Sequence, residues 1–293
     1  MGMKTLAGLY HAPAGHWVGD GFPVRTLFSY GRLGRLLSPF LLFDYAGPMD
    51  FTPAARPRGV GEHPHRGFET VTLVYSGEVS HRDSAGGGGT IGPGDVQWMT
   101  ASAGLMHEEF HSEAFTRTGG RFECVQLWVN LPAKDKAVPP HYQTILARDI
   151  PMVELPSGAG SLRLIAGEFA GTHGPAKSFT PMNVWDLTLK AGADIELPAR
   201  EGWTCVVALL RGGVTLESGE VMTDADLAVF SIEGSNLRLN ARSDSVLVVL
   251  GGEPINEPIA GYGPFVMNTR REIEEAFADL EAGRFGRLAP APG

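Results

Sequence analysis

Cysteine is scarce in this chain: only Cys124 and Cys205 occur among 293 residues, and each lies within an apolar run. A disulfide framework is therefore excluded, and we expect two buried free thiols, as in a reducing compartment. Lys and Arg number 24 against 33 Asp and Glu, which gives a net charge of −9. Sequence-independent binding to nucleic acid or to acidic lipid requires clustered positive charge. We therefore expect no direct nucleic-acid partner.

Long apolar runs and targeting signals are also missing. The strongest apolar runs, such as Phe40–Phe43 and Val246–Leu250, have the length of a strand, whereas a membrane helix needs roughly 20 apolar residues. The segment Met1–Tyr10 carries one charged residue and no sustained apolar stretch, so it does not read as a signal peptide. These absences predict a cytoplasmic protein that does not associate with a membrane.

What the chain does contain is a series of short apolar segments separated by turn residues. The 39 Gly and 21 Pro punctuate segments such as Thr70–Tyr75, Thr204–Leu210 and Ser245–Leu250, a pattern typical of an all-β sandwich or barrel. One helix is predicted near the C-terminus, where Thr269-Arg-Arg-Glu272 forms a capping box sequence. It is followed by one apolar face at helical spacing, formed by Ile273, Ala276, Phe277 and Leu280.

The β pattern occurs twice. Residues 67–79 and 202–214 share glycines at both ends, an aromatic residue after the first glycine and apolar positions between them. Two copies of one β unit predict two tandem β-barrels. Because the connection near 139–156 is rich in Pro, we place the boundary there and predict an N-terminal domain of residues 1–145 and a C-terminal domain of residues 146–293.

Two short motifs in the first copy carry chemistry. His63 and His65 are two residues apart, as are His107 and Glu109, so in extended chain each pair points to one face. If neighbouring strands bring the pairs together, three imidazoles and one carboxylate would suit a first-row divalent metal. Four protein ligands would leave open positions for substrate or dioxygen. The second copy has Pro198 and Arg200 where the first has its two histidines, and neither His nor Glu in Leu237–Asn240, so we expect no metal there.

Five longer motifs identify a family resemblance. They are Phe40–Asp44, His63–Thr70, Gly92–Thr100, Leu127–Leu131 and Gly263–Thr269, and together they resemble the motifs of pirins, members of the bicupin group. The resemblance implies an all-β bicupin fold of two tandem, jelly-roll-like antiparallel β-barrels with a C-terminal helix. It implies one metal ion in the N-terminal barrel, with Fe(II) expected first and Mn, Co, Ni or Cu as alternatives. Carried over by motif position, the ligands are His63, His65, His107 and Glu109.

Several nearby residues leave alternatives open. Glu69 fits the spacing of the general cupin motif and competes with Glu109 as the carboxylate ligand; in a pirin it would instead be a pocket group. Arg66 could steer an anionic substrate or be a solvated charge on the rim. His111 and His141 are interpreted as surface or loop residues.

The predicted centre suggests a reaction type. A divalent ion with three neutral imidazoles and one carboxylate favours an enolate or phenolate ligand, and Glu109 could act as general base toward the substrate hydroxyl. The resemblance implies quercetin 2,3-dioxygenase activity, in which a flavonol ring is opened with dioxygen and carbon monoxide is released. Two alternatives remain: a dioxygenase for another enediol or phenolic substrate, and a redox- or metal-sensing regulatory protein that binds a protein partner, as a transcriptional coregulator does.

Overall fold

The computed structural model describes residues 2–289. The chain forms two compact units that alternate along the sequence. Unit 1 consists of residues 1–14, 36–39 and 148–254, and unit 2 consists of residues 15–35, 40–147 and 255–293. The chain passes from unit 2 to unit 1 after residue 147. The N-terminal segment belongs to unit 1, which consists mainly of the C-terminal half, and the C-terminal segment belongs to unit 2, which consists mainly of the N-terminal half. The division into an N-terminal domain of residues 1–145 and a C-terminal domain of residues 146–293 stays a prediction.

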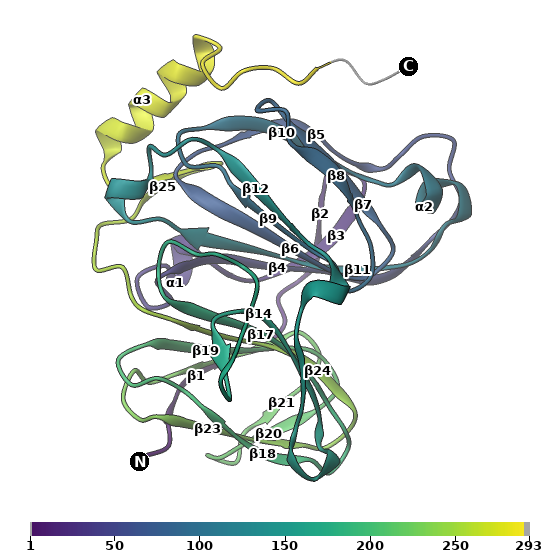
Figure 1. Cartoon of the computed structure of the whole chain (residues 1–293), viewed down its shortest axis with the longest axis vertical. Helices are drawn as coiled ribbons and strands as arrows, with labels where there is room; N and C mark the ends of the chain where they lie inside the picture. The colour runs from purple at the N-terminus through teal and green to yellow at the C-terminus, as the bar shows by residue number, and fades with distance from the viewer. Residues whose placement is uncertain (1, 290–293) are drawn as a thin grey trace. The chain divides into compact units, whose positions relative to one another are not determined.

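Unit 2 is built from two antiparallel sheets, both visible in Figure 1. Its seven-stranded sheet has the order β12 (His141–Ile145), β9 (Val96–Thr100), β6 (Phe68–Ser76), β11 (Gly120–Asn130), β4 (Phe40–Phe51), β3 (Phe22–Ser29) and β2 (His16–Val18). Its four-stranded sheet has the order β5 (Gly59–His65), β10 (Leu105–His111), β7 (Val79–Asp83) and β8 (Gly88–Ile91).

Unit 1 repeats this plan. Its seven-stranded sheet has the order β1 (Leu6–Tyr10), β22 (Asp226–Phe230), β19 (Thr204–Arg211), β24 (Ser245–Gly252), β17 (Met182–Leu189), β14 (Gly160–Ala166) and β13 (Met152–Glu154). Its four-stranded sheet consists of β18 (Asp194–Pro198), β23 (Asn236–Ala241), β20 (Val214–Leu216) and β21 (Val221–Met222). Strands β6 and β19, which carry the repeated sequence, occupy the same place in their sheets. The all-β fold with two copies of one β unit is therefore confirmed.

Shorter elements complete the two units. Two hairpins pair β15 (Glu168–Phe169) with β16 (Thr172–His173) and β25 (Ala260–Tyr262) with β26 (Phe265–Met267). The helices are α1 (Tyr30–Leu33), α2 (Glu113–Thr118) and α3 (Arg270–Glu281), with 3₁₀ turns at η1 (Ala133–Asp135), η2 (Ala147–Asp149) and η3 (Pro156–Gly158).

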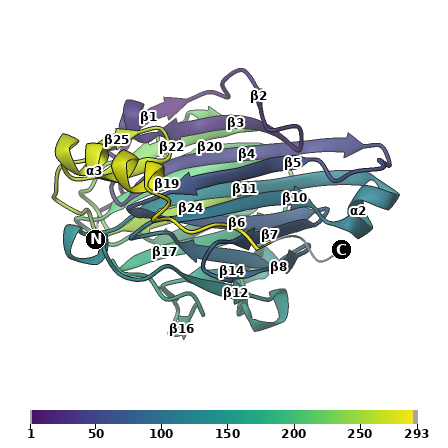
Figure 2. The same cartoon turned by 90° about the horizontal axis from the view of Figure 1, so that it is seen from above.

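The predicted C-terminal helix is α3, and its capping box is present. The Thr269 hydroxyl accepts a hydrogen bond from the backbone N–H of Glu272, and the Glu272 carboxylate accepts one from the backbone N–H of Thr269. Ile273 and Ala276 are buried in one cluster with Phe265 of β26, and α3 lies beside the hairpin strand β25 in Figures 1 and 2. The helix thus belongs to the packed part of unit 2.

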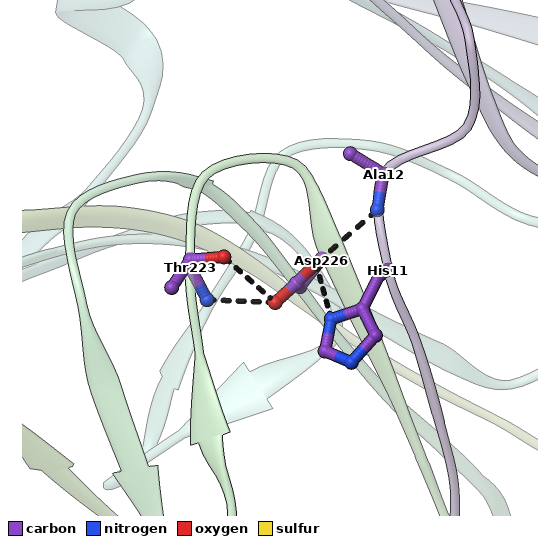
Figure 3. A network of polar contacts seen from close by, with 4 residues as sticks. All are labelled: His11, Ala12, Thr223 and Asp226. Atoms are coloured by element: carbon purple, nitrogen blue, oxygen red, sulfur yellow. Dashed lines mark hydrogen bonds and ion pairs between the residues drawn. The ribbon is translucent and has the colours of Figure 1, made fainter.

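In unit 1 a buried carboxylate holds the chain that follows β1. Asp226 is 1% exposed, and Figure 3 shows four hydrogen bonds to its carboxylate. His11 Nδ1 and the backbone N–H of Ala12 contact Oδ1, at 3.1 and 3.2 Å. The backbone N–H and the hydroxyl of Thr223 donate to Oδ2, at 2.7 and 3.1 Å. Because both oxygens are saturated, this carboxylate fastens the N-terminal strand to β22.

Two expectations about composition can be compared with the structure. Cys124 and Cys205 are both buried and free, as predicted. Within residues 2–289, no helix combines the length and the apolar character that crossing a membrane requires.

Candidate metal centre

Two neighbouring strands of the four-stranded sheet in unit 2 carry the predicted ligands. Strand β5 provides His63 and His65, and strand β10 provides His107 and Glu109. The antiparallel register places His107 directly opposite His63, and it shifts before Glu109, which lies opposite Val60. The shift leaves more residues on β5 than on β10, a bulge of the kind that re-aims side chains near functional sites.

The three imidazoles form one cluster. Their candidate ligand nitrogens all lie within 4.8 Å of one another, and the ring centroids of His63 and His107 are 4.2 Å apart. His65 and His107 are buried, and His63 is half-buried. Neutral imidazole nitrogens at this spacing can share one ion.

The hydrogen-bond pattern of these rings fits a metal ion. Both ring nitrogens of His107 and Nδ1 of His65 are buried and have no hydrogen-bond partner within residues 2–289. A buried unpaired polar atom costs about 1–3 kcal/mol, so three of them in one cluster indicate a missing partner. His63 differs because its Nδ1 lies 2.8 Å from the carbonyl oxygen of Gly61, which fixes the ring orientation and leaves Nε2 for an ion.

Burial and mutual repulsion keep the rings of His65 and His107 neutral. Burial lowers the pKa of His107 well below its usual value, and the neighbouring His65, His63 and His81 lower it further. Burial and the proximity of His63 lower the pKa of His65 in the same way. Neutral imidazole is the form that binds a metal, so these two rings can accept a divalent ion without first losing a proton.

Glu109 lies outside the three-histidine group but lines the same cavity. Its Oε2 accepts a hydrogen bond from Gln126 Nε2 at 3.0 Å, and Gln126 Oε1 accepts one from Trp128 Nε1 at 3.3 Å. Burial raises the pKa of Glu109 above its usual value, and the proximity of His63 and the hydrogen bond from Gln126 offset part of this rise. The relay from Trp128 through Gln126 therefore fixes the carboxyl group and counteracts part of the effect of burial. The role of Glu109 as fourth ligand stays a prediction.

The cluster opens onto a cavity of about 310 Å³, bounded by residues of both sheets of unit 2. This volume is at the lower end of the range for small-molecule sites. Most of its wall is apolar, with a few polar groups placed among apolar side chains. The lining residues are Val18, Phe22, Val24, Asp44, Ala46, Val60, His63, His65, Thr72, Glu109, Cys124, Gln126 and Trp128.

Glu69, the competing carboxylate, lies on the other face of its strand. Side chains alternate along β6, and Thr72, three residues further on, lines the cavity. Glu69 instead accepts a hydrogen bond from the Thr100 hydroxyl at 2.7 Å, and burial raises its pKa to about 7. The spacing argument fails because β5 ends at His65 and β6 begins at Phe68, so the two-residue period does not continue from one strand into the next.

Two other candidates also differ from expectation. Arg66 forms an ion pair with Asp279 of α3, so it faces the helix and does not line the cavity. His111 is 2% exposed and packs against the rings of Phe51 and Phe122, so its interpretation as a surface residue is wrong. It has the same parity on β10 as His107 and Glu109, and it therefore points into the interior with them.

The cavity residues on the seven-stranded sheet were not found from the sequence. Gln126 and Thr72 contribute to the polar surroundings of Glu109, and Asp44 lines the same wall. Each is a polar residue with an apolar residue on either side within its strand, which is the signal that could have found them.

Comparison with known proteins identifies the family. Residues 21–129 match the Pirin family, and residues 184–286 match the Pirin C-terminal cupin domain. The chain belongs to the pirin family. The resemblance inferred from sequence motifs is thereby confirmed, and the two repeated β units are its two cupin domains.

Relatives of this pirin cover nearly its whole length. A Pseudomonas aeruginosa protein provisionally named quercetin 2,3-dioxygenase is 58% identical over 286 residues, which is 97% of this chain and 99% of that protein. The crystal structure of a quercetin 2,3-dioxygenase from Acinetobacter baumannii superimposes with a TM-score of 0.96 at 54% identity, over 98% of this chain and 100% of that one. An Escherichia coli pirin crystallised with nickel(II) shares the fold, with a TM-score of 0.63 at 20% identity over 84% and 100% of the two chains.

Proposed function

We propose that this pirin is a metal-dependent dioxygenase that opens the ring of a flavonol such as quercetin with dioxygen and releases carbon monoxide. The observation that carries the proposal is the cluster of three imidazoles. Three of their ring nitrogens have no hydrogen-bond partner within the described residues, and His63 and His65 line a largely apolar cavity. The names of the Pseudomonas and Acinetobacter relatives support the substrate class. The predicted cytoplasmic location is part of the proposal.

His63, His65, His107 and Glu109 would hold one divalent ion. Fe(II) is our first expectation, with Mn, Co, Ni or Cu as alternatives, because such a donor set selects poorly among first-row metals by affinity alone. When bound, the ion would supply Lewis acidity and open coordination positions for the substrate and dioxygen.

The residues of the chain have separate tasks in this reaction. Glu109 would accept the proton of the substrate hydroxyl, as a buried carboxylate positioned within the cavity. Gln126 holds Glu109 through the 3.0 Å hydrogen bond and in turn is oriented by Trp128. The apolar side chains of the wall bury the planar ring system and exclude water, which strengthens every polar interaction inside the cavity.

The decisive experiment measures carbon monoxide released from quercetin under oxygen by protein loaded with Fe(II). Native protein is expected to release carbon monoxide and His107→Ala is expected not to. His141→Ala is the matched control because His141 is an exposed histidine outside the cavity, and it should retain the activity.

Absence of carbon monoxide from protein shown to carry one metal ion per chain would refute the flavonol proposal. Consumption of dioxygen with another enediol or phenol would then support a different substrate. If no such compound is consumed, the redox- or metal-sensing role with a protein partner becomes the better hypothesis.

A further inference from the structure

A row of polar side chains crosses the inner face of the seven-stranded sheet in unit 2. The registers pair Thr26 with Asp44, Asp44 with Gln126, Gln126 with Thr72, and Thr72 with Gln97. Directly paired residues project to the same face, and three members of the row line the cavity. The sheet therefore presents one band of hydrogen-bonding groups opposite the histidine cluster.

The next row on the same face is apolar. It consists of Val24, Ala46, Cys124 and Val74, which are paired in this order across β3, β4, β11 and β6, four of the five strands of the polar band. These residues belong to a hydrophobic cluster of unit 2. Because the row beside the polar band is buried and apolar, this face of the sheet points to the interior and the polar band does not face solvent.

Among the members that line the cavity, Gln126 donates to Glu109, whereas the Thr72 hydroxyl has no hydrogen-bond partner within the described residues. Asp44 is the acidic member of the band. The Thr26 hydroxyl donates to Asp44 Oδ1 at 2.5 Å, and within residues 2–289 no hydrogen bond to Oδ2 is found. Asp44 thus offers a carboxylate oxygen to the cavity, and the hydrogen bond from Thr26 holds its other oxygen.

We infer that Asp44 binds a hydroxyl group of the substrate at a position remote from the oxygen that meets the metal. This inference deepens the proposed function and rests on it for the orientation of the substrate. Asp44 lies one strand beyond Gln126, about 4.8 Å further from the carboxyl group of Glu109. A ring system that reaches from the histidines to Asp44 needs a hydrogen-bond donor at its far end.

Burial raises the pKa of Asp44, whereas the hydrogen bond from Thr26 and the nearby His16 favour its ionised form. In that form Asp44 also disfavours some substrates. A phenolic hydroxyl can donate to a carboxylate, whereas a carboxylate, sulfonate or phosphate on the substrate would be repelled by it. Glu109 adds a second acidic group in the same cavity. The substrate class assigned by this geometry is a neutral, planar phenol with a second hydroxyl group, and anionic conjugates are selected against.

The test measures the affinity of flavonols for metal-loaded protein in the absence of oxygen, by fluorescence or absorbance titration. Three ligands are compared: quercetin, 3-hydroxyflavone, which lacks the remote hydroxyl groups, and a flavonol sulfonated on the remote ring. The variant is Asp44→Asn, which has nearly the same shape and can keep the hydrogen bond from Thr26. The matched control is Asp50→Asn, on an exposed side chain of the same strand.

Asp44→Asn is expected to weaken quercetin binding about tenfold, because a hydrogen bond to a charged acceptor is lost, and to leave 3-hydroxyflavone binding unchanged. The sulfonated flavonol is expected to bind several-fold more tightly to the variant than to native protein. A merely structural role cannot produce this gain, because a damaged cavity would bind all three ligands less well. Asp50→Asn should change none of the three affinities.

Equal loss for all three ligands, or no change, would overturn the role of Asp44. The same titrated samples are then exposed to oxygen and assayed for carbon monoxide, which separates the two proposals. If Asp44→Asn changes the three affinities as expected but no carbon monoxide is released, the role of Asp44 is supported and the dioxygenase proposal is refuted. If carbon monoxide is released but the three affinities do not change as expected, the dioxygenase proposal is supported and the role of Asp44 is refuted. If no flavonol binds, both proposals are refuted.

Discussion

The hydrogen bond from Gln126 to Glu109 yields the sharpest prediction about the metal centre. Gln126→Leu keeps most of the side-chain volume but removes the donor that lies 3.0 Å from Glu109 Oε2. Glu109 is 4% exposed, so water cannot readily replace the lost donor. A hydrogen bond to a charged group contributes about 1.5–3 kcal/mol, which corresponds to about 10- to 100-fold in an equilibrium constant. We expect the affinity for Fe(II) to fall by a factor in this range.

The measurement is competition with a coloured chelator at neutral pH, for native protein, Gln126→Leu, Glu109→Gln and the double variant. If Gln126 acts through the carboxylate, the substitution should cost much less in the Glu109→Gln background than in native protein. Trp128→Phe tests the outer step of the relay. It keeps the aromatic ring that stacks on Phe68 but loses the N–H that orients Gln126, so a smaller loss of affinity is expected.

Two results would contradict this reasoning. An unchanged Fe(II) affinity in Gln126→Leu would show that the hydrogen bond does not support metal binding. An equal loss in native and Glu109→Gln backgrounds would show that Gln126 acts on the cavity without involving Glu109. The unfolding midpoint of each metal-free variant shows whether the fold has been affected.

Three further predictions concern stability. His107→Leu should leave the Tm of metal-free protein unchanged or raise it, because two buried unpaired nitrogens are removed, and it should abolish the rise in Tm on adding metal. Asp226→Ala should lower the free energy of unfolding by on the order of 2–4 kcal/mol in urea titrations, because donors from Ala12 and Thr223 lose their acceptor. The pKa of Glu69 is raised from 4.5 to about 7, so its ionisation costs about 3 kcal/mol of stability above pH 7, and this cost disappears as the pH falls to 4.5. Glu69→Gln should therefore be more stable than native protein at pH 8 by up to that amount and equally stable at pH 4.5.

The duplicated β architecture was predictable because its signals are local. Turn residues and alternating apolar positions define individual strands, and the repeated glycines of residues 67–79 and 202–214 mark one strand of each unit. The capping box at Thr269 and Glu272 likewise depends on neighbours in sequence. The assignment of both chain ends to the opposite unit was not predictable, because it depends on which sheet edge a terminal strand pairs with. Strand β1 pairs with β22, more than 200 residues away in the chain.

The candidate site was predictable only in part for a similar reason. The two-residue spacing of His63 and His65 holds within one strand, and it correctly placed both in one cluster with His107. The two-residue spacing did not hold for Glu69, because β5 ends between His65 and Glu69 and a new strand begins. Gln126 and Asp44 could not be assigned to the site from spacing, because their place beside it is set by the register between strands from distant parts of the sequence.

The two units together explain why polar groups accumulate in one and not in the other. In unit 1 the strands at the places of β5 and β10 are β18 and β23, where Leu197 pairs with Leu237 and both are buried in a continuous apolar core. In unit 2 the corresponding strands carry three imidazoles, and three of their ring nitrogens, on His65 and His107, lack partners within the described residues. An apolar interior stabilises the fold without any ligand, whereas buried unpaired nitrogens destabilise it. The apolar core of unit 1 therefore contributes stability without a ligand, whereas the destabilising unpaired nitrogens lie in unit 2. This arrangement is expected if the histidines serve binding and not folding.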